Sequence, residues 1–102
     1  MKKRKRLTKE VKIGRIVLRY NKSIENHIAK HNVKIKDVVK SLSNDYLLRK
    51  IKDRNWVAIA KHPESGRYLT IFLYQIRKLE FRIKTVRDST DAEKRLYKKH
   101  IK

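Results

Sequence analysis

Near the start of the chain, hydrophobic residues partly alternate with polar ones. A period of two is typical of a strand that buries one face. The alternation runs over residues 11–20, and the candidates for burial are Val11, Ile13, Ile16 and Leu18. The pattern therefore predicts a single strand over residues 11–20.

After residue 20 the apolar positions recur every three or four residues, as they do along one face of a helix. Asn21 or Ser23 is able to cap a first helix, and Asn32 suits the left-handed conformation that ends one. A second short helix is predicted from the same spacing at Ile35, Val38, Val39 and Leu42. Two consecutive helices are therefore expected before residue 43.

From residue 46 the spacing returns to that of strands, interrupted by turn residues such as Pro63-Glu64-Ser65-Gly66. The segment 67–74 is apolar on both faces, as is typical of a central strand, so we expect Phe72 and Phe81 to lie in the core. Leu79 is expected on the same buried face as Phe81. Four strands are predicted here, at residues 46–51, 56–62, 67–74 and 79–87.

A capping box predicts where the last helix begins. The Thr90 hydroxyl is placed to accept from the Glu93 amide while the Glu93 carboxylate reaches back, so a helix should follow over residues 91–100. The element order becomes β-α-α-β-β-β-β-α. This order predicts an α+β domain in which an antiparallel four- to five-stranded sheet is flanked by two N-terminal helices and one C-terminal helix.

Charge changes the picture more than any other compositional feature. The 102 residues contain 30 Lys and Arg against 10 acidic residues, a formal net charge of +20. Self-repulsion of this size costs folding stability, and a polyanionic partner whose phosphates take up the charge explains it. No apolar run approaches the roughly 20 residues of a membrane span, so no membrane partner is expected.

Cysteine is absent, which excludes disulfides, thiolate zinc sites and cysteine nucleophiles. The basic start of the chain has no apolar stretch behind it and does not resemble a secretory signal, so a cytoplasmic location is expected. We divide the chain into a basic arm, residues 1–10, and a single domain, residues 11–102. The arm is predicted to lie along a phosphate backbone through Lys2, Lys3, Arg4, Lys5 and Arg6.

Neither a metal nor another cofactor is predicted. His27 and His31 are four residues apart, as in zinc-binding helices, but Ile28 stands where such a motif has its glutamate, and no third ligand is evident. With only two glycines, the chain has no phosphate-cradling loop.

RNA cleavage without a metal remains as plausible chemistry. The 2′-hydroxyl attacks its own phosphate, so an enzyme must supply a proton acceptor, a proton donor and cations for the developing charge. His31 or His62 is able to exchange protons near neutral pH. The sequence offers several cations for the phosphate and does not choose among them: Arg67, Arg82, Arg87, Lys61 and Lys84.

Aromatic residues on the predicted strands are interleaved with basic ones, and bases of single-stranded nucleic acid stack on exposed rings beside cations. Trp56, next to Arg54 at the start of a strand, is the least clearly a core residue. We therefore predict nucleic-acid contacts at Arg54, Trp56, Lys61, Arg82 and Lys84, in addition to those of the arm.

Three segments in order resemble a known family. They are residues 24–33 (IENHIAKHNV), the Gly66-Arg67 hairpin, and residues 85–97 (TVRDSTDAEKRLY). Over roughly residues 15 to 100 the chain looks like the BrnT family, which are ribonuclease toxins of type II toxin–antitoxin systems with a RelE-like fold. The resemblance implies cleavage of RNA without a metal, neutralisation by a cognate antitoxin protein, and catalytic roles for Lys30, His31, Arg67, Arg87 and Tyr97.

Two functions remain open at this point. One is a metal-independent endoribonuclease toxin, and the other is a non-catalytic nucleic-acid-binding protein that retains the toxin fold. RNA and an antitoxin are the expected partners, and a homodimer is possible.

Overall fold

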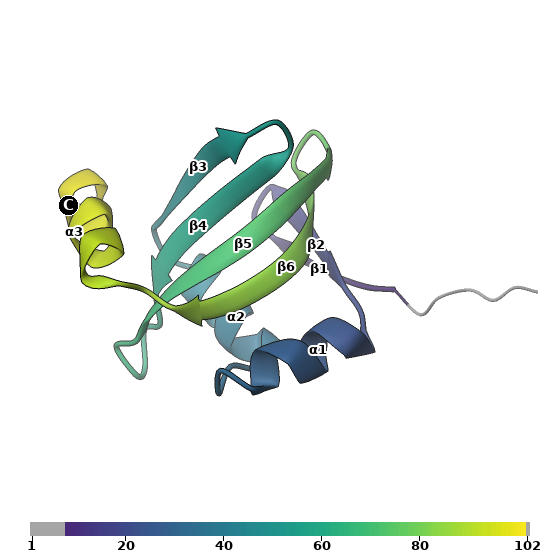
Figure 1. The fold of residues 1–102 in the computed structure, drawn as a ribbon, viewed down its shortest axis with the longest axis horizontal. Helices are drawn as coiled ribbons and strands as arrows, with labels where there is room; N and C mark the ends of the chain where they lie inside the picture. The colour runs from purple at the N-terminus through teal and green to yellow at the C-terminus, as the bar shows by residue number, and fades with distance from the viewer. Residues whose placement is uncertain (1–7, 102) are drawn as a thin grey trace, which may run out of the picture.

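The computed structural model describes residues 8–101. These residues form one six-stranded sheet with three helices, in which strands neighbour each other in the order β1-β2-β6-β5-β4-β3 (Figure 1). The elements are β1 (Lys9–Ile13), β2 (Ile16–Tyr20), α1 (Lys22–Ala29), α2 (Ile35–Leu42), β3 (Tyr46–Lys52), β4 (Asn55–Lys61), β5 (Tyr68–Arg77), β6 (Glu80–Asp88) and α3 (Asp91–His100).

The predicted single strand at residues 11–20 is wrong, because the chain reverses there. Gly14 has a φ of 60°, a backbone conformation that favours glycine, and it starts a two-residue turn between the antiparallel strands β1 and β2. Because β1 begins at Lys9, the last two residues of the predicted arm also belong to the sheet.

The α+β class and the three helices are confirmed, but the predicted antiparallel sheet of four to five strands is wrong. The sheet has six strands and is mixed, since β2 pairs in parallel with β6 while every other pairing is antiparallel. The hairpin β1–β2 adds the extra strand. After β2 the chain passes through α1 and α2 to β3, which lies at the opposite edge of the sheet. β6 then returns to lie beside β2.

Local capping explains why the helices begin where they do. The Asn21 side chain accepts the backbone amide of Ile24 at the start of α1, and Asn32, with a φ of 61°, ends the turn that follows. At α3 the predicted capping box is present: Thr90 accepts from the Glu93 amide, and Glu93 accepts from the Thr90 amide.

One hydrophobic core lies between the sheet and the helices α1 and α2. Phe81 is buried in it as predicted, with Leu18, Ile28, Val38, Leu42, Ile71, Leu73, Ile83 and Val86. Phe72 is not a core residue: β5 is apolar on both faces, but Phe72 points to the face opposite α1 and α2 and is half-buried. Leu79 is not buried either, because it forms the β5–β6 turn with a φ of 61° and is 38% exposed.

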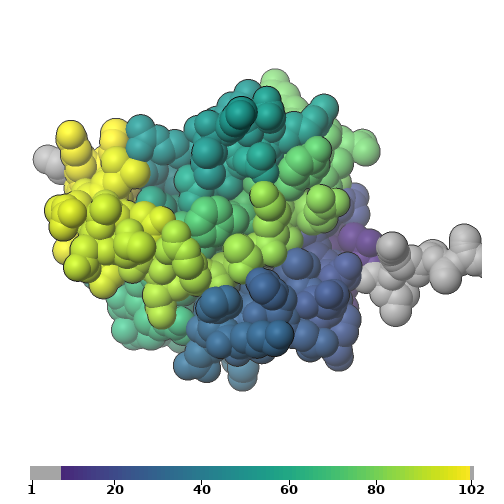
Figure 2. Space-filling model, viewed as in Figure 1, coloured from purple at the N-terminus to yellow at the C-terminus, as the bar shows by residue number. Residues whose placement is uncertain are grey.

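We call the sheet face opposite α1 and α2 the outer face. Its end next to the start of β5 is covered by α3, while the strands between α3 and α1 stay open (Figures 1 and 2). Within the described residues, no helix has the length and apolar character needed to cross a membrane.

Candidate nucleic-acid interface

Aromatic rings and cations alternate on the outer face. Along β5, Tyr68, Phe72 and Tyr74 point outward between the core residues Leu69, Ile71 and Leu73. Each outward ring has a cation over it: Lys61 lies 5.5 Å from the Tyr68 centroid, Arg87 lies 5.0 Å from that of Phe72, and Arg82 lies 5.0 Å from that of Tyr74. These separations are those of cation–π contacts. The face therefore joins flat apolar surfaces to positive charge, the combination that single-stranded nucleic acid prefers.

Lys84 adds a further cation to this face. Its ammonium group donates to Asn55 Oδ1 at 2.8 Å, which ties β6 to the start of β4 across β5. Lys61, Arg82 and Lys84, all proposed from sequence as nucleic-acid contacts, therefore share the outer face.

Arg54 and Trp56 have different surroundings. Arg54 donates to the backbone carbonyls of Gln75 and Ile76, and so fixes one hairpin to the next. Trp56 packs edge-on against the core residue Phe81, with 5.8 Å between ring centroids, and its indole N–H donates to Gln75 Oε1. Its ring is therefore half-buried on the core side of the sheet. The arm residues Lys2, Lys3, Arg4, Lys5 and Arg6 lie outside the described part of the chain.

Arg87 is held in a two-pronged ion pair with Glu93. Its Nη1 and Nη2 atoms donate to Oε1 and Oε2 of Glu93, each at 2.9 Å, and Thr70 donates to the same carboxylate. Hydrogen bonds from Arg87 are the main reason that the pKa of Glu93 falls to about 2, and the amide of Thr90 and the hydroxyl of Thr70 lower it further against the effect of burial. The guanidinium is therefore fixed in place between Phe72 and the start of α3.

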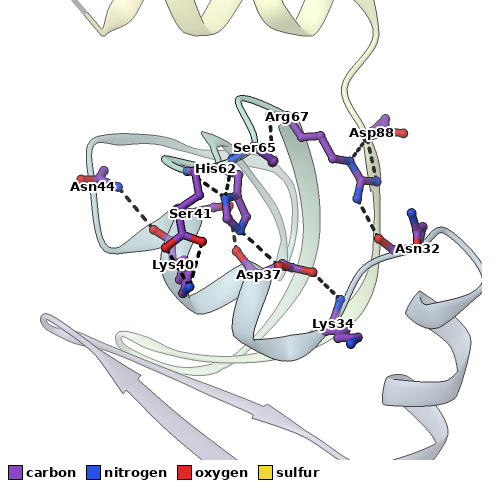
Figure 3. A network of polar contacts seen from close by, with 11 residues as sticks. Asn32, Lys34, Asp37, Lys40, Ser41, Asn44, His62, Ser65, Arg67 and Asp88 are labelled. Atoms are coloured by element: carbon purple, nitrogen blue, oxygen red, sulfur yellow. Dashed lines mark hydrogen bonds and ion pairs between the residues drawn. The ribbon is translucent and has the colours of Figure 1, made fainter.

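Arg67 links three segments at one end of the sheet. It donates to the backbone carbonyl of His31 at 3.1 Å. It also donates to that of Asn32 at 2.7 Å and forms an ion pair with Asp88 at 2.9 Å (Figure 3). The turn after α1 is thereby attached to the residue that precedes β5 and to the last residue of β6. Because Asp88 follows Arg87 directly, the sequence-predicted residues His31, Arg67 and Arg87 all lie at this end.

Lys30 and His31 are exposed where α1 ends. The His31 ring packs edge-on against His27, with 5.9 Å between centroids, and His27 itself contacts the Thr85 hydroxyl at 3.0 Å. The Arg67 bonds go to the backbone of this turn and leave the His31 imidazole open to solvent.

Tyr97 joins α3 to the sheet. Its ring meets that of Tyr68 edge-on at 5.6 Å, and its hydroxyl donates to the Asp45 carbonyl at 3.2 Å. Burial, with the nearby Asp45 and Tyr68, raises the pKa of Tyr97. The hydroxyl therefore keeps its proton more firmly than that of an ordinary tyrosine and donates it to the Asp45 carbonyl.

His62 does not fit a proton-transfer role. It is 6% exposed; its Nδ1 accepts the backbone amides of Glu64 and Ser65, and its Nε2 faces Asp37 Oδ1 at 3.1 Å (Figure 3). Since Nδ1 already accepts, the Nε2–H must donate to Asp37, which fixes one neutral tautomer. His62 therefore serves to hold the β4–β5 turn against α2.

A polar cavity of about 620 Å³ opens beside this pair. Its walls combine cations with two carboxylates that already have partners: Asp37 bonds His62, and Glu64 bonds Lys40. Among residues 8–101, no three His, Asp or Glu side chains gather closely enough to hold a metal ion.

Sequence reasoning missed three residues near the site. The sequence predicts Glu93 only as part of the capping box and does not indicate its ion pair with Arg87. Lys94 and Lys98 were not singled out, although their spacing of four on α3 places them on one side of that helix.

Comparison with known proteins gives no relative: no family model, no curated protein and no solved structure matches this chain. The function is therefore argued from the residues and their geometry.

Proposed function

We propose that this chain is an endoribonuclease that binds RNA across the outer face of its sheet and cleaves it without a metal ion, as BrnT-type toxins of type II toxin–antitoxin systems do. The observation that carries the proposal is the position of the predicted catalytic residues. His31, Arg67, Arg87 and Tyr97 come from four separate segments that meet around the start of β5 and the end of β6. Arg67 bonds the His31 backbone and pairs with Asp88, which follows Arg87, and Tyr97 contacts Tyr68, which follows Arg67.

In the proposed reaction the 2′-oxygen attacks the adjacent phosphorus and the bond to the 5′-oxygen breaks, giving a cyclic phosphate and a free 5′-hydroxyl. His31 or Lys30 takes the proton from the 2′-hydroxyl, and the Tyr97 hydroxyl, which the resemblance assigns a catalytic role, gives its proton to the leaving oxygen. Arg67 and Arg87 stabilise the charge that develops on the phosphate. Water then hydrolyses the cyclic phosphate, or the cyclic phosphate remains as the product.

The second candidate is a nucleic-acid-binding protein without catalysis. One observation favours it: both arginines already have carboxylate partners, Arg67 with Asp88 and Arg87 with Glu93. A catalytic guanidinium would have to share these bonds with the substrate phosphate, whereas the rings and cations of the outer face bind RNA without any such exchange.

The test is incubation of the pure protein with end-labelled single-stranded RNA, with and without EDTA, beside an RNA of the same sequence that carries 2′-deoxy sugars. The proposal expects cleavage of the RNA alone, unchanged by EDTA, with products that end in a cyclic phosphate. Arg87→Lys should lose most of the cleavage because the two-pronged contact is gone, while Arg95→Lys on the exposed side of α3 should not.

Binding without cleavage in this experiment establishes the second candidate instead. Cleavage that EDTA abolishes, or that also cuts the 2′-deoxy strand, would exclude the proposed chemistry.

A further inference from the structure

Three lysines surround a single aromatic ring where α3 meets the sheet. The ammonium groups of Lys61, Lys98 and Lys94 lie 5.5, 5.6 and 5.8 Å from the centroid of Tyr68. Lys61 is the cross-strand partner of Tyr68, while Lys94 and Lys98 are one helical turn apart on α3. We call Lys61, Lys94 and Lys98 the lysine cluster.

This arrangement concentrates positive charge without balancing it. Among residues 8–101, none of the three ammonium groups has a carboxylate within 4.0 Å, whereas the neighbouring Arg67 and Arg87 are each paired. All three surround one ring within a distance comparable to the screening length, about 8 Å at physiological salt, so they repel one another. The attraction of each ammonium group to the ring offsets part of this repulsion.

The cluster is nevertheless held in place. Tyr97 fixes α3 through its edge-on contact with Tyr68 and its hydrogen bond to the Asp45 carbonyl. On the sheet side, β4 and β5 pair in unbroken register from Asn55 to Lys61. Like charges kept together by the fold indicate a site for an anion, because a bound anion removes the repulsion that the free protein bears.

We propose that the lysine cluster is a phosphate-binding site that takes a phosphate of the RNA. Lysine donates up to three hydrogen bonds as a compact point charge, and three such groups around one ring supply the donors and the positive charge that a phosphate takes up. The site lies at the end of the row of outward rings on β5 and next to the Arg87–Glu93 pair. Lys94 directly follows Glu93. Tyr68 lies two residues before Thr70, which is paired with Arg87 across the strands β5 and β6. The RNA part of this proposal rests on the proposed function, whereas the phosphate site itself does not.

The test uses the full chain and two double variants that remove the same charge. Lys94→Gln with Lys98→Gln disrupts the cluster, and Lys22→Gln with Lys36→Gln removes two exposed lysines from α1 and α2, on the other side of the sheet. Lysine side-chain NMR signals are followed while inorganic phosphate is added. Affinity is measured for a short single-stranded RNA bearing either a 5′-phosphate or a 5′-hydroxyl, and circular dichroism checks that each variant is folded.

We expect phosphate to shift the signals of Lys61, Lys94 and Lys98 more than those of Lys22 and Lys36. The cluster variant should bind RNA about tenfold more weakly than wild type, a loss of the size expected for one charge-assisted phosphate contact, and the control variant should stay within about threefold. A preference for the 5′-phosphate identifies a terminal phosphate as the ligand, and equal binding identifies an internal one.

Two results separate this proposal from the function it extends. Uniform lysine shifts, together with wild-type RNA affinity in the cluster variant, overturn the phosphate site and leave the RNA function standing. Selective shifts at the cluster in a protein that binds no RNA overturn the proposed function and keep the phosphate site.

Discussion

At the scale of single residues, Glu93 determines how the predicted catalytic residue Arg87 is held. Glu93 performs two tasks: its Oε1 accepts the Thr90 amide of the helix cap, and its two oxygens together hold Arg87. The capping box can be predicted from the sequence because its two residues, Thr90 and Glu93, are only three positions apart. The bond between Glu93 and Arg87 could not be predicted, since Asp88 and Asp91 lie nearer to Arg87 in the chain. The bend between β6 and α3 brings Glu93 to Arg87 instead.

The depressed pKa of Glu93 predicts how stability depends on pH. A carboxyl whose folded pKa, about 2, lies below its usual value stabilises the fold above that usual value and loses the contribution as pH falls toward 2. The fall of the pKa from 4.5 to about 2 corresponds to a full contribution of at most about 3 kcal/mol to the free energy of unfolding. The side chain is only 22% exposed, so solvent screens the ion pair weakly. Urea unfolding of wild type and Glu93→Gln should differ clearly at pH 6 and much less at pH 2.5. An equal difference at both pH values would show that the pair with Arg87 contributes little.

Phe72 illustrates a second limit at this scale. The sequence shows correctly that β5 is apolar on both faces, and a ring on such a strand is expected in the core. Here α3 covers only one end of the outer face, so Phe72 is covered by the Arg87 guanidinium instead of by another helix. Which face of a strand a helix covers depends on distant segments, and no local pattern reports it.

Among the elements, those with local signals were predicted and those set by distant pairing were not. The helices begin at Asn21 and Thr90, whose side chains cap them directly. The parallel pairing of β2 with β6 joins Val17 to Glu80, and nothing in either segment indicates the other. The β1–β2 turn was missed because Gly14 alone interrupts the apolar pattern.

The β1–β2 hairpin gives a prediction about stability. Gly14 has a φ of 60°, and a Cβ added there would meet nothing within 4 Å, so any cost of a side chain comes from the backbone. Gly14→Ala should lower the free energy of unfolding by roughly 1–2 kcal/mol, as measured by urea denaturation. The neighbouring Arg15→Ala, at an exposed position, should change it by less than about 0.5 kcal/mol. Equal effects of the two substitutions would mean that the turn does not require glycine.

For the whole molecule, the excess of positive charge determines how the proposed binding of RNA should depend on salt. A net charge of +20 predicts that RNA affinity falls steeply with salt, by about 0.7 in the log–log slope for each phosphate neutralised on a single strand. Fluorescence anisotropy of a labelled RNA between low and moderate salt measures this slope. A slope near zero would remove the argument from charge.

Total charge alone does not say where RNA would lie, and we propose that it lies on the outer face. The most direct test compares two variants of identical charge: Arg82→Glu with Lys84→Glu on the outer face, and Lys22→Glu with Lys36→Glu on the helices behind it. Each replaces two cations by two anions, so the formal net charge falls by four, from +20 to +16. We predict that the outer-face variant binds single-stranded RNA more than about tenfold more weakly than the helix variant at one salt concentration. Equal affinities, or a larger loss in the helix variant, would contradict the outer face as the RNA-binding surface.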